Sequence, residues 1–164
     1  MTRRPLRILF VCLGNICRSP IAEGVFRHHI VRGGLTAHIE IASAGTGDWH
    51  VGKPPDARMC ATALGRGVDI SGQRARTLAS ARDLEGWDHI LVMDRQNLAN
   101  TRRLAQTEDQ RARIALFRDF DPEPEDGEVP DPYYGAQADF DLVYEIVDRT
   151  GRALLEHLRR EHGL

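Results

Sequence analysis

The chain has 164 residues, of which 41% are hydrophobic and 28% are charged, and its formal net charge is −2 with a pI near 6.4. This length and composition predict one globular domain over residues 1–164, with a hydrophobic core of ordinary size. The small negative charge gives no electrostatic reason to expect nucleic acid or a membrane as a partner, and no apolar run approaches the ~18 residues of a membrane-spanning helix.

The first predicted elements are a strand and a helix joined by a loop. Residues 6–11 are apolar apart from Arg7, which is typical of a strand buried on both faces of a parallel sheet. Pro20 suits the first position of a helix, and Ser19 before it is a preferred N-cap. One face of this helix is apolar, and Gly33 is expected to end it.

Residues 12–19, Cys-Leu-Gly-Asn-Ile-Cys-Arg-Ser, thus lie between the carboxyl end of a strand and a helix N-terminus, where open α/β sheets bind ligands. Free N–H groups at the helix start suit a phosphate-sized anion, and Arg18 can hold two of its oxygens. The same positive field favours a thiolate on Cys12, which makes it a nucleophile aimed at phosphorus. The alternative is a structural cysteine near a surface arginine. Gly14 and Asn15, which tolerate unusual backbone angles, favour the phosphate loop.

The rest of the chain predicts alternating strands and helices. Strands are expected at residues 39–43, 87–93 and 112–117, and helices at 56–64, 95–105 and 139–158, with a short helix near 79–84. Asp94 is placed to cap the helix that follows it. Four strands alternating with helices predict an α/β fold with a mostly parallel sheet and helices on both faces.

Residues 119–131 contain seven acidic residues and three prolines, which predicts an irregular, acidic surface loop. Asp131 differs from the other six because Pro132 follows it and restricts its backbone, which helps to aim the carboxylate.

Residues 11–23, which contain this loop, resemble the signature loop of the low-molecular-weight protein tyrosine phosphatases. Residues 131–134, Asp-Pro-Tyr-Tyr, resemble the general-acid loop of that family, and residues 43–46 and 92–94 fit it as well. The resemblance covers nearly the whole chain. It implies a single three-layer α/β domain with a four-stranded parallel sheet in the order 2-1-3-4 and the phosphate-binding loop after strand 1.

The resemblance also implies a metal-independent protein-tyrosine-phosphatase that needs no cofactor. Cys12 would form a phosphocysteine, Arg18 would hold the phosphoryl oxygens, and Asp131 would act as the general acid. Asn15 and Ser43 would brace the loop, with Asn15 in a left-handed conformation. Ser19 would donate its hydroxyl to the Cys12 thiolate as well as cap the helix. The residues expected to bind substrate are Leu13, Gly14, Asn15, Ile16, Cys17, Ser19, Trp49, Tyr133 and Tyr134.

The cysteines and Trp49 leave alternatives open. Cys17 is either a small buried hydrophobe or a resolving thiol that condenses with oxidised Cys12. Trp49 is either a core residue or an aromatic wall over the pocket. The three cysteines, at 12, 17 and 60, lack the spacing of a disulfide scaffold, so we expect reduced thiols and a cytoplasmic protein. No metal site is expected, because the chain has no Cys-x-x-Cys pair.

Three rival functions are disfavoured. An arsenate reductase needs two further cysteines, but only Cys60 lies outside the loop. The arginine phosphatases carry threonine where this chain has Ile16. An inactive phosphate-binding module would not need an acid such as Asp131. The expected partners are phosphate or another oxyanion in the loop and a protein that contains phosphotyrosine, with a bacterial tyrosine kinase as one candidate.

Overall fold

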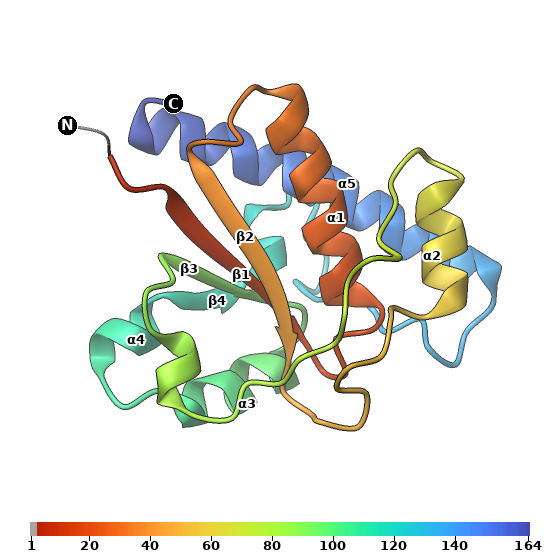
Figure 1. Ribbon diagram of the computed structural model, residues 1–164, viewed down its shortest axis with the longest axis horizontal. Coiled ribbons are helices and arrows are strands. Elements are labelled where there is room, and N and C mark those ends of the chain that lie inside the picture. Colours follow the sequence, from red (N-terminus) through yellow and green to blue (C-terminus); the bar gives the residue numbers. More distant parts are fainter. Residues whose placement is uncertain (1–2) are drawn as a thin grey trace.

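The computed structural model describes residues 3–164, and its strands form one sheet. The sheet is parallel and has the order β2-β1-β3-β4 (Figure 1). Its strands are β1 (Leu6–Cys12), β2 (Ile39–Gly45), β3 (His89–Val92) and β4 (Ile114–Leu116). Cys12 pairs with Gly45 at the carboxyl end of the central pair. The predicted fold class and strand order are confirmed.

Helices cover both faces of this sheet. One face carries α1 (Arg18–Arg32), α2 (Ala57–Leu64) and α5 (Gln137–His162), and the other carries α3 (Arg95–Leu104) and α4 (Glu108–Ala112) (Figure 1). Two short 3₁₀ helices, η1 (Ala81–Leu84) and η2 (Phe117–Phe120), connect these elements. Within residues 3–164, no helix has the length and apolar character needed to cross a bilayer.

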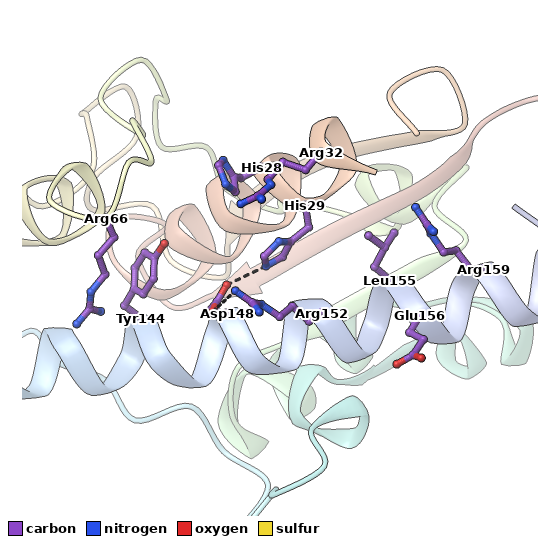
Figure 2. Close-up of a pocket in the computed structure, with 10 residues that line it drawn as sticks. All are labelled: His28, His29, Arg32, Arg66, Tyr144, Asp148, Arg152, Leu155, Glu156 and Arg159. Atoms are coloured by element: carbon purple, nitrogen blue, oxygen red, sulfur yellow. Dashed lines mark hydrogen bonds and ion pairs between the residues drawn. The ribbon is translucent and has the colours of Figure 1, made fainter. Parts of the chain in front are cut away.

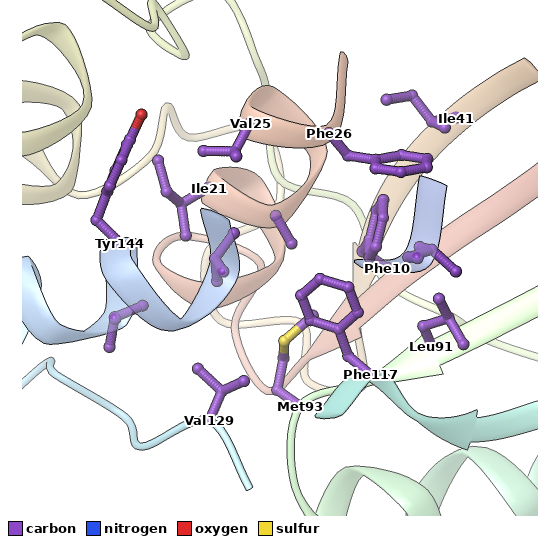
Figure 3. Packing of buried hydrophobic residues seen from close by; sticks show 14 of the residues in the cluster. Phe10, Ile21, Val25, Phe26, Ile41, Leu91, Met93, Phe117, Val129 and Tyr144 are labelled. Atoms are coloured by element: carbon purple, nitrogen blue, oxygen red, sulfur yellow. The ribbon is translucent and has the colours of Figure 1, made fainter. Parts of the chain in front are cut away.

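Side chains on the two faces of β1 pack into two separate hydrophobic clusters. Phe10 points toward α1 and α5, and its ring packs edge-on against Phe26 at 5.7 Å and Phe117 at 5.3 Å between ring centroids (Figure 3). Leu9 and Val11 point to the opposite face, into the cluster beneath α3. Each aromatic pair contributes about 0.5–1.5 kcal/mol beyond its buried area. Both faces of the strand that ends at Cys12 are therefore held by packing.

Two strands are shorter than predicted. β3 begins at His89 rather than at residue 87. β4 begins at Ile114, because residues 108–112 form α4, whose first turn is capped by the Thr107 hydroxyl accepting from the Gln110 amide at 3.1 Å. The threonine cap and two acids in the first turn favour a helix over the predicted extension of the strand.

The predicted helix cap at Ser19 is wrong. α1 begins two residues earlier than predicted, at Arg18 rather than Pro20, and its N-cap residue, Cys17, makes no side-chain cap bond. The Ser19 hydroxyl is fully buried and lies 3.0 Å from Cys12 Sγ and 2.7 Å from Asn15 Nδ2. It is thus engaged with the loop rather than with the free amides of the helix.

The acidic segment contains a buried carboxylate that the sequence does not reveal. Asp121 pairs with Arg118 at 2.9 Å and with Arg149 of α5 at 2.8 Å, and its side chain is excluded from solvent. Burial alone would raise the pKa of Asp121, but hydrogen bonds from Arg149, the Glu123 amide and Arg118 outweigh it and lower the pKa to about 2. For Asp121, the expectation of a solvated surface charge is wrong.

Candidate active site

The loop between β1 and α1 lies at the carboxyl edge of the sheet and forms the floor of a cavity of about 350 Å³. The predicted nucleophile, arginine and acid all reach this cavity, although Asp131 is more than a hundred residues from the loop in the sequence. The lining residues are Cys12, Leu13, Gly14, Ile16, Cys17, Arg18, Trp49, His50, Asp131, Tyr133 and Tyr134.

Asn15 holds the loop from behind. Its φ of 56° is in the left-handed region, and its amide nitrogen donates to Ser19 Oγ at 2.7 Å and to Ser43 Oγ at 3.0 Å. Its amide oxygen accepts from the Arg76 backbone N–H at 3.0 Å. The conformation and the Ser43 bond are those expected by resemblance. Asn15 and Ser19 are buried behind the loop and do not line the cavity, so their side chains brace the loop instead of touching a ligand.

Arg18 is held by two partners besides the predicted acid. Its Nη1 donates to Asp94 Oδ2 at 2.7 Å and to the Val129 carbonyl at 3.0 Å, and its Nη2 lies 3.6 Å from Asp131 Oδ2. Asp94 also caps α3 by accepting from the Asn97 amide at 2.7 Å, as predicted. Its second bond, to Arg18, was not predicted, because a residue that follows a strand and caps a helix needs no further role.

The charge on Arg18 is secured by its surroundings. Arg18 is only 3% exposed, and burial opposes a charged guanidinium, but neighbouring Cys12, Asp94 and Asp131 outweigh burial and raise its pKa above the ordinary value. A fixed positive fork therefore faces the cavity beside the thiol.

Arg58 of α2 ties the acid loop to the phosphate loop. It donates to the Tyr133 carbonyl at 2.8 Å and pairs with Asp56 at 2.9 Å. The Asp56 amide in turn donates to the Ile16 carbonyl at 2.8 Å. The Asp131 carboxylate accepts from the Tyr133 amide at 3.1 Å, which closes a turn around Pro132. Nothing in the local sequence pattern marks Arg58 for this role, because its partners come from distant segments.

Aromatic side chains form the rim of the cavity. Trp49 is 66% exposed and lines the cavity, so it is not a core residue. Tyr134 is almost fully exposed, whereas Tyr133 is about one-third exposed and its ring lies 6.5 Å from that of His50. A Cβ atom at residue 14 would lie 2.9 Å from the His50 ring, so Gly14 permits the close approach of these two segments.

The second loop cysteine is buried. Cys17 is 4% exposed and packs in the hydrophobic cluster, and burial, followed by the negative charge of Asp56, raises the pKa of its thiol. All three cysteines are unpaired. Within residues 3–164, no group of three or more histidine, cysteine, aspartate or glutamate side chains is arranged to hold a metal ion.

This arrangement suits attack by a thiolate on a bound tetrahedral anion. Cys12 Sγ has the Ser19 hydroxyl 3.0 Å away, Arg18 supplies positive charge, and the partly exposed Asp131 carboxylate lies 3.6 Å from Arg18 Nη2. A thiol, a guanidinium and a carboxyl group around one aromatic-rimmed cavity are the groups that phosphoryl transfer by a cysteine requires.

Comparisons with known proteins agree with this geometry. Residues 7–163 match the profile of the family described as low molecular weight phosphotyrosine protein phosphatase. A phosphatase of that name from Sus scrofa is 40% identical over 153 residues, which cover 93% of this chain and 95% of the relative.

Two solved structures are similar over almost their whole lengths. YfkJ from Bacillus subtilis superposes with a TM-score of 0.91 at 34% identity and covers 99% of both chains. A protein tyrosine phosphatase from Entamoeba histolytica, with Hepes in its active site, gives a TM-score of 0.88 at 35% identity, covering 96% of this chain and 98% of that one.

Proposed function

The chain belongs to the low molecular weight phosphotyrosine protein phosphatase family, and we propose that it hydrolyses phosphotyrosine through a phosphocysteine formed on Cys12. The observation that carries this proposal is the meeting of Cys12, Arg18 and Asp131 in one cavity. The three residues come from the end of β1, the start of α1 and the loop before α5.

In the first step the Cys12 thiolate attacks phosphorus. A sulfur–phosphorus bond forms while the bond from phosphorus to the phenolic oxygen breaks, and Asp131 gives its proton to the departing oxygen. Charge in the transition state is spread over the three equatorial oxygens. The Arg18 fork and the backbone amides of residues 13–18 would hold these oxygens, which preorganises the site before the reaction.

In the second step water hydrolyses the phosphocysteine. Asp131, now deprotonated, takes a proton from water while the new oxygen–phosphorus bond forms and the sulfur–phosphorus bond breaks. Cys12 leaves as a thiolate, for which the Ser19 hydroxyl at 3.0 Å is a ready donor. Inorganic phosphate then leaves the loop.

The rim of the cavity favours an aryl phosphate. Trp49 and Tyr133 both line the cavity, where a phenyl ring of the substrate can stack against them. The shorter phosphoserine side chain has no ring to place there. We therefore propose phosphotyrosine in a protein as the substrate, a bacterial tyrosine kinase being one candidate, and no nucleic acid or membrane as partner. The unpaired cysteines fit the proposed cytoplasmic location.

The role of Asp131 can be tested with substrates that differ in their leaving groups. Asp131→Asn removes the proton donor but keeps the shape of the side chain, so turnover of phenyl phosphate should fall by roughly 10²–10⁴-fold. The fall should be smaller with p-nitrophenyl phosphate, whose leaving group needs less protonation. Asp119→Asn is the matched control, because Asp119 is an exposed acid of the same segment. Equal losses in both variants, or losses that do not depend on the leaving group, would place the acid elsewhere.

The nucleophile and the substrate class need separate measurements. Cys12→Ser should abolish turnover but retain binding of vanadate, because the anion is cradled mainly by backbone amides. More than a few per cent residual activity would contradict the covalent route.

For substrate class, kcat/KM for a phosphotyrosine peptide should exceed the values for phosphoserine and phosphoarginine peptides of the same sequence. A preference for phosphoarginine would reassign the substrate and leave the cysteine chemistry intact.

A further inference from the structure

A second cavity lies between α1 and α5 (Figure 2). Its volume is about 580 Å³, which is in the range of pockets for small molecules. It is formed by the last turns of α1, the turn after α2 and the middle of α5. None of its lining residues lines the active-site cavity.

The walls of this cavity are rich in cations. We call it the basic cleft and define it by Arg32, Arg66, Arg152 and Arg159 together with His28 and His29. Two carboxylates also line it, those of Asp148 and Glu156, so its lining holds two more arginines than carboxylates, and Asp141 and Glu145 lie just outside the lining beside Arg66. The whole chain has a net charge of −2, so the cleft has the opposite sign to the molecule around it.

One of the two carboxylates, Asp148, compensates the charge of Arg152. Asp148 is already engaged, with His29 at 2.9 Å and Arg152 at 3.2 Å. Glu156 points to the side of α5 that faces away from α1 (Figure 2). Among residues 3–164, Arg32 has no hydrogen bond or ion pair from its side chain, and neither has His28.

The remaining two arginines lie toward the ends of the cleft. Arg66 stacks over the Tyr144 ring at 4.6 Å, donates to the Asp141 carbonyl at 3.4 Å, and makes long ion pairs at 3.6 Å to Asp141 and 4.0 Å to Glu145. Arg159 donates to the Gly33 carbonyl at 3.1 Å, a neutral partner that leaves its charge uncompensated.

The cations are spaced along the cleft rather than gathered at one point. Arg152 and Arg159 are seven residues apart on α5, or about 10 Å at 1.5 Å per residue. Arg66 lies beyond Tyr144 at the opposite end from Arg159, and Arg32 stands on the α1 wall between them (Figure 2). A single phosphate would meet only one or two of these groups, whereas a chain of phosphates could meet several.

We propose that the basic cleft binds a small linear polyanion with two or more linked phosphate groups, such as inorganic tripolyphosphate or the phosphate chain of a nucleotide. Guanidinium groups recognise phosphate oxygens by paired hydrogen bonds, and four of them, on α1, α5 and the turn after α2, can supply such pairs along the length of the polyanion. The site is separate from the phosphate loop: Arg32 lies fourteen residues after Arg18 on α1, or about 21 Å along the helix.

The test is titration calorimetry with sodium tripolyphosphate on the full chain. One molecule should bind per chain, and the affinity should fall as NaCl is added, because the contacts are between exposed charges. Arg32→Glu and Arg152→Glu should each weaken binding at least tenfold. Arg32→Gln, which removes the charge without reversing it, should weaken binding less, by about threefold. Arg160→Glu is the matched control: it makes the same charge change on α5 but lies outside the cleft, and should alter affinity by less than twofold.

Two further measurements identify the ligand and test whether it binds in the phosphate loop instead. ATP binding as tightly as tripolyphosphate would show that the phosphates alone are recognised, whereas tighter binding of ATP would add a nucleoside contact; both support the proposal. Inhibition of p-nitrophenyl phosphate hydrolysis by inorganic phosphate should be unchanged in Arg32→Glu.

Three results would overturn the proposal. The first is an equal loss of affinity in Arg160→Glu and Arg32→Glu, which would show only a long-range effect of charge. The second is tripolyphosphate binding that vanadate abolishes and the cleft variants leave unchanged, which would place the ligand in the phosphate loop. The third is binding of an RNA oligonucleotide without binding of tripolyphosphate.

Discussion

Replacing Asn15 should separate two contributions to the geometry of the phosphate loop. Asn15→Ala removes three buried hydrogen bonds, to Ser19 Oγ, Ser43 Oγ and the Arg76 amide. At roughly 0.5–1.5 kcal/mol each, these contribute about 1.5–4.5 kcal/mol. The φ of 56° adds a second cost, because alanine in the left-handed region is disfavoured by about 1–2 kcal/mol. Together these lower the free energy of unfolding by about 2.5–6.5 kcal/mol.

Asn15→Gly isolates the backbone contribution. Glycine loses the same hydrogen bonds but adopts the left-handed conformation freely. Its larger entropy in the unfolded chain costs about 0.5–1 kcal/mol, which offsets part of the gain. Asn15→Gly should therefore be more stable than Asn15→Ala by about 0.5–1 kcal/mol. Ser43→Ala, which removes one of the three bonds, should cost about a third as much as the bonds together.

Urea denaturation measures these differences, and kinetics measure their consequence. Both Asn15 variants should lower kcat/KM for p-nitrophenyl phosphate by about 10²-fold, because a misplacement of 1 Å in the reacting groups has an effect of that size. If the free energies of unfolding of both variants lie within 1 kcal/mol of the wild-type value, the hydrogen bonds of Asn15 do not stabilise the loop. If alanine and glycine are equal in stability, the argument from φ is wrong.

Four further outcomes are expected. Trp49→Ala should raise KM for aryl phosphates by about 2–10-fold, because it removes the binding energy of one aromatic contact. KM for phosphoserine should be unchanged in the same steady-state assay. Arg58→Ala removes the hydrogen bond that anchors the acid loop at Tyr133, so it should slow turnover of phenyl phosphate more than turnover of p-nitrophenyl phosphate. Arg58→Lys should restore part of the loss. Equal slowing of both substrates would reject this role. Peroxide should inactivate the enzyme reversibly through a disulfide between Cys12 and Cys17, detectable by mass spectrometry; sulfonic acid on Cys12 as the sole product would exclude a resolving thiol. Asp121→Asn should cost about 2–3 kcal/mol of stability at pH 7, because the folded pKa of about 2 lies below the ordinary value near 3.9. That stabilisation is complete above pH 4 and is lost as the pH falls through about 2, so wild type and variant should converge in acid denaturation.

The phosphate loop was predictable from the sequence because all its parts are local. A buried strand, a helix start and the residues Cys12 to Arg18 are contiguous, so the geometry of one strand–loop–helix unit places the thiol, the amides and the guanidinium together. The alternation of strands and helices likewise constrained the sheet to be mostly parallel, because right-handed crossovers leave few other arrangements. The strand order came from family resemblance, and the structure agrees with it.

Side-chain partners that are distant in sequence were decided only by the tertiary structure. Ser19 was expected both to cap a helix and to donate its hydroxyl to Cys12. The structure places the hydroxyl beside Cys12 and Asn15, and α1 begins before Ser19, so only the contact with Cys12 is present. Asp121 sits among solvated acids in the sequence, and only the approach of α5 buries it against Arg149.

The same distinction explains the basic cleft and the anchoring of the acid loop. Arg58 contacts the Tyr133 carbonyl, and the arginines of α1 and α5 line one cleft, only because distant segments pack together. A local pattern reports which backbone conformation a segment prefers and which of its faces is apolar. It carries no information about which distant group a polar side chain will contact, since that depends on how the helices pack against the sheet.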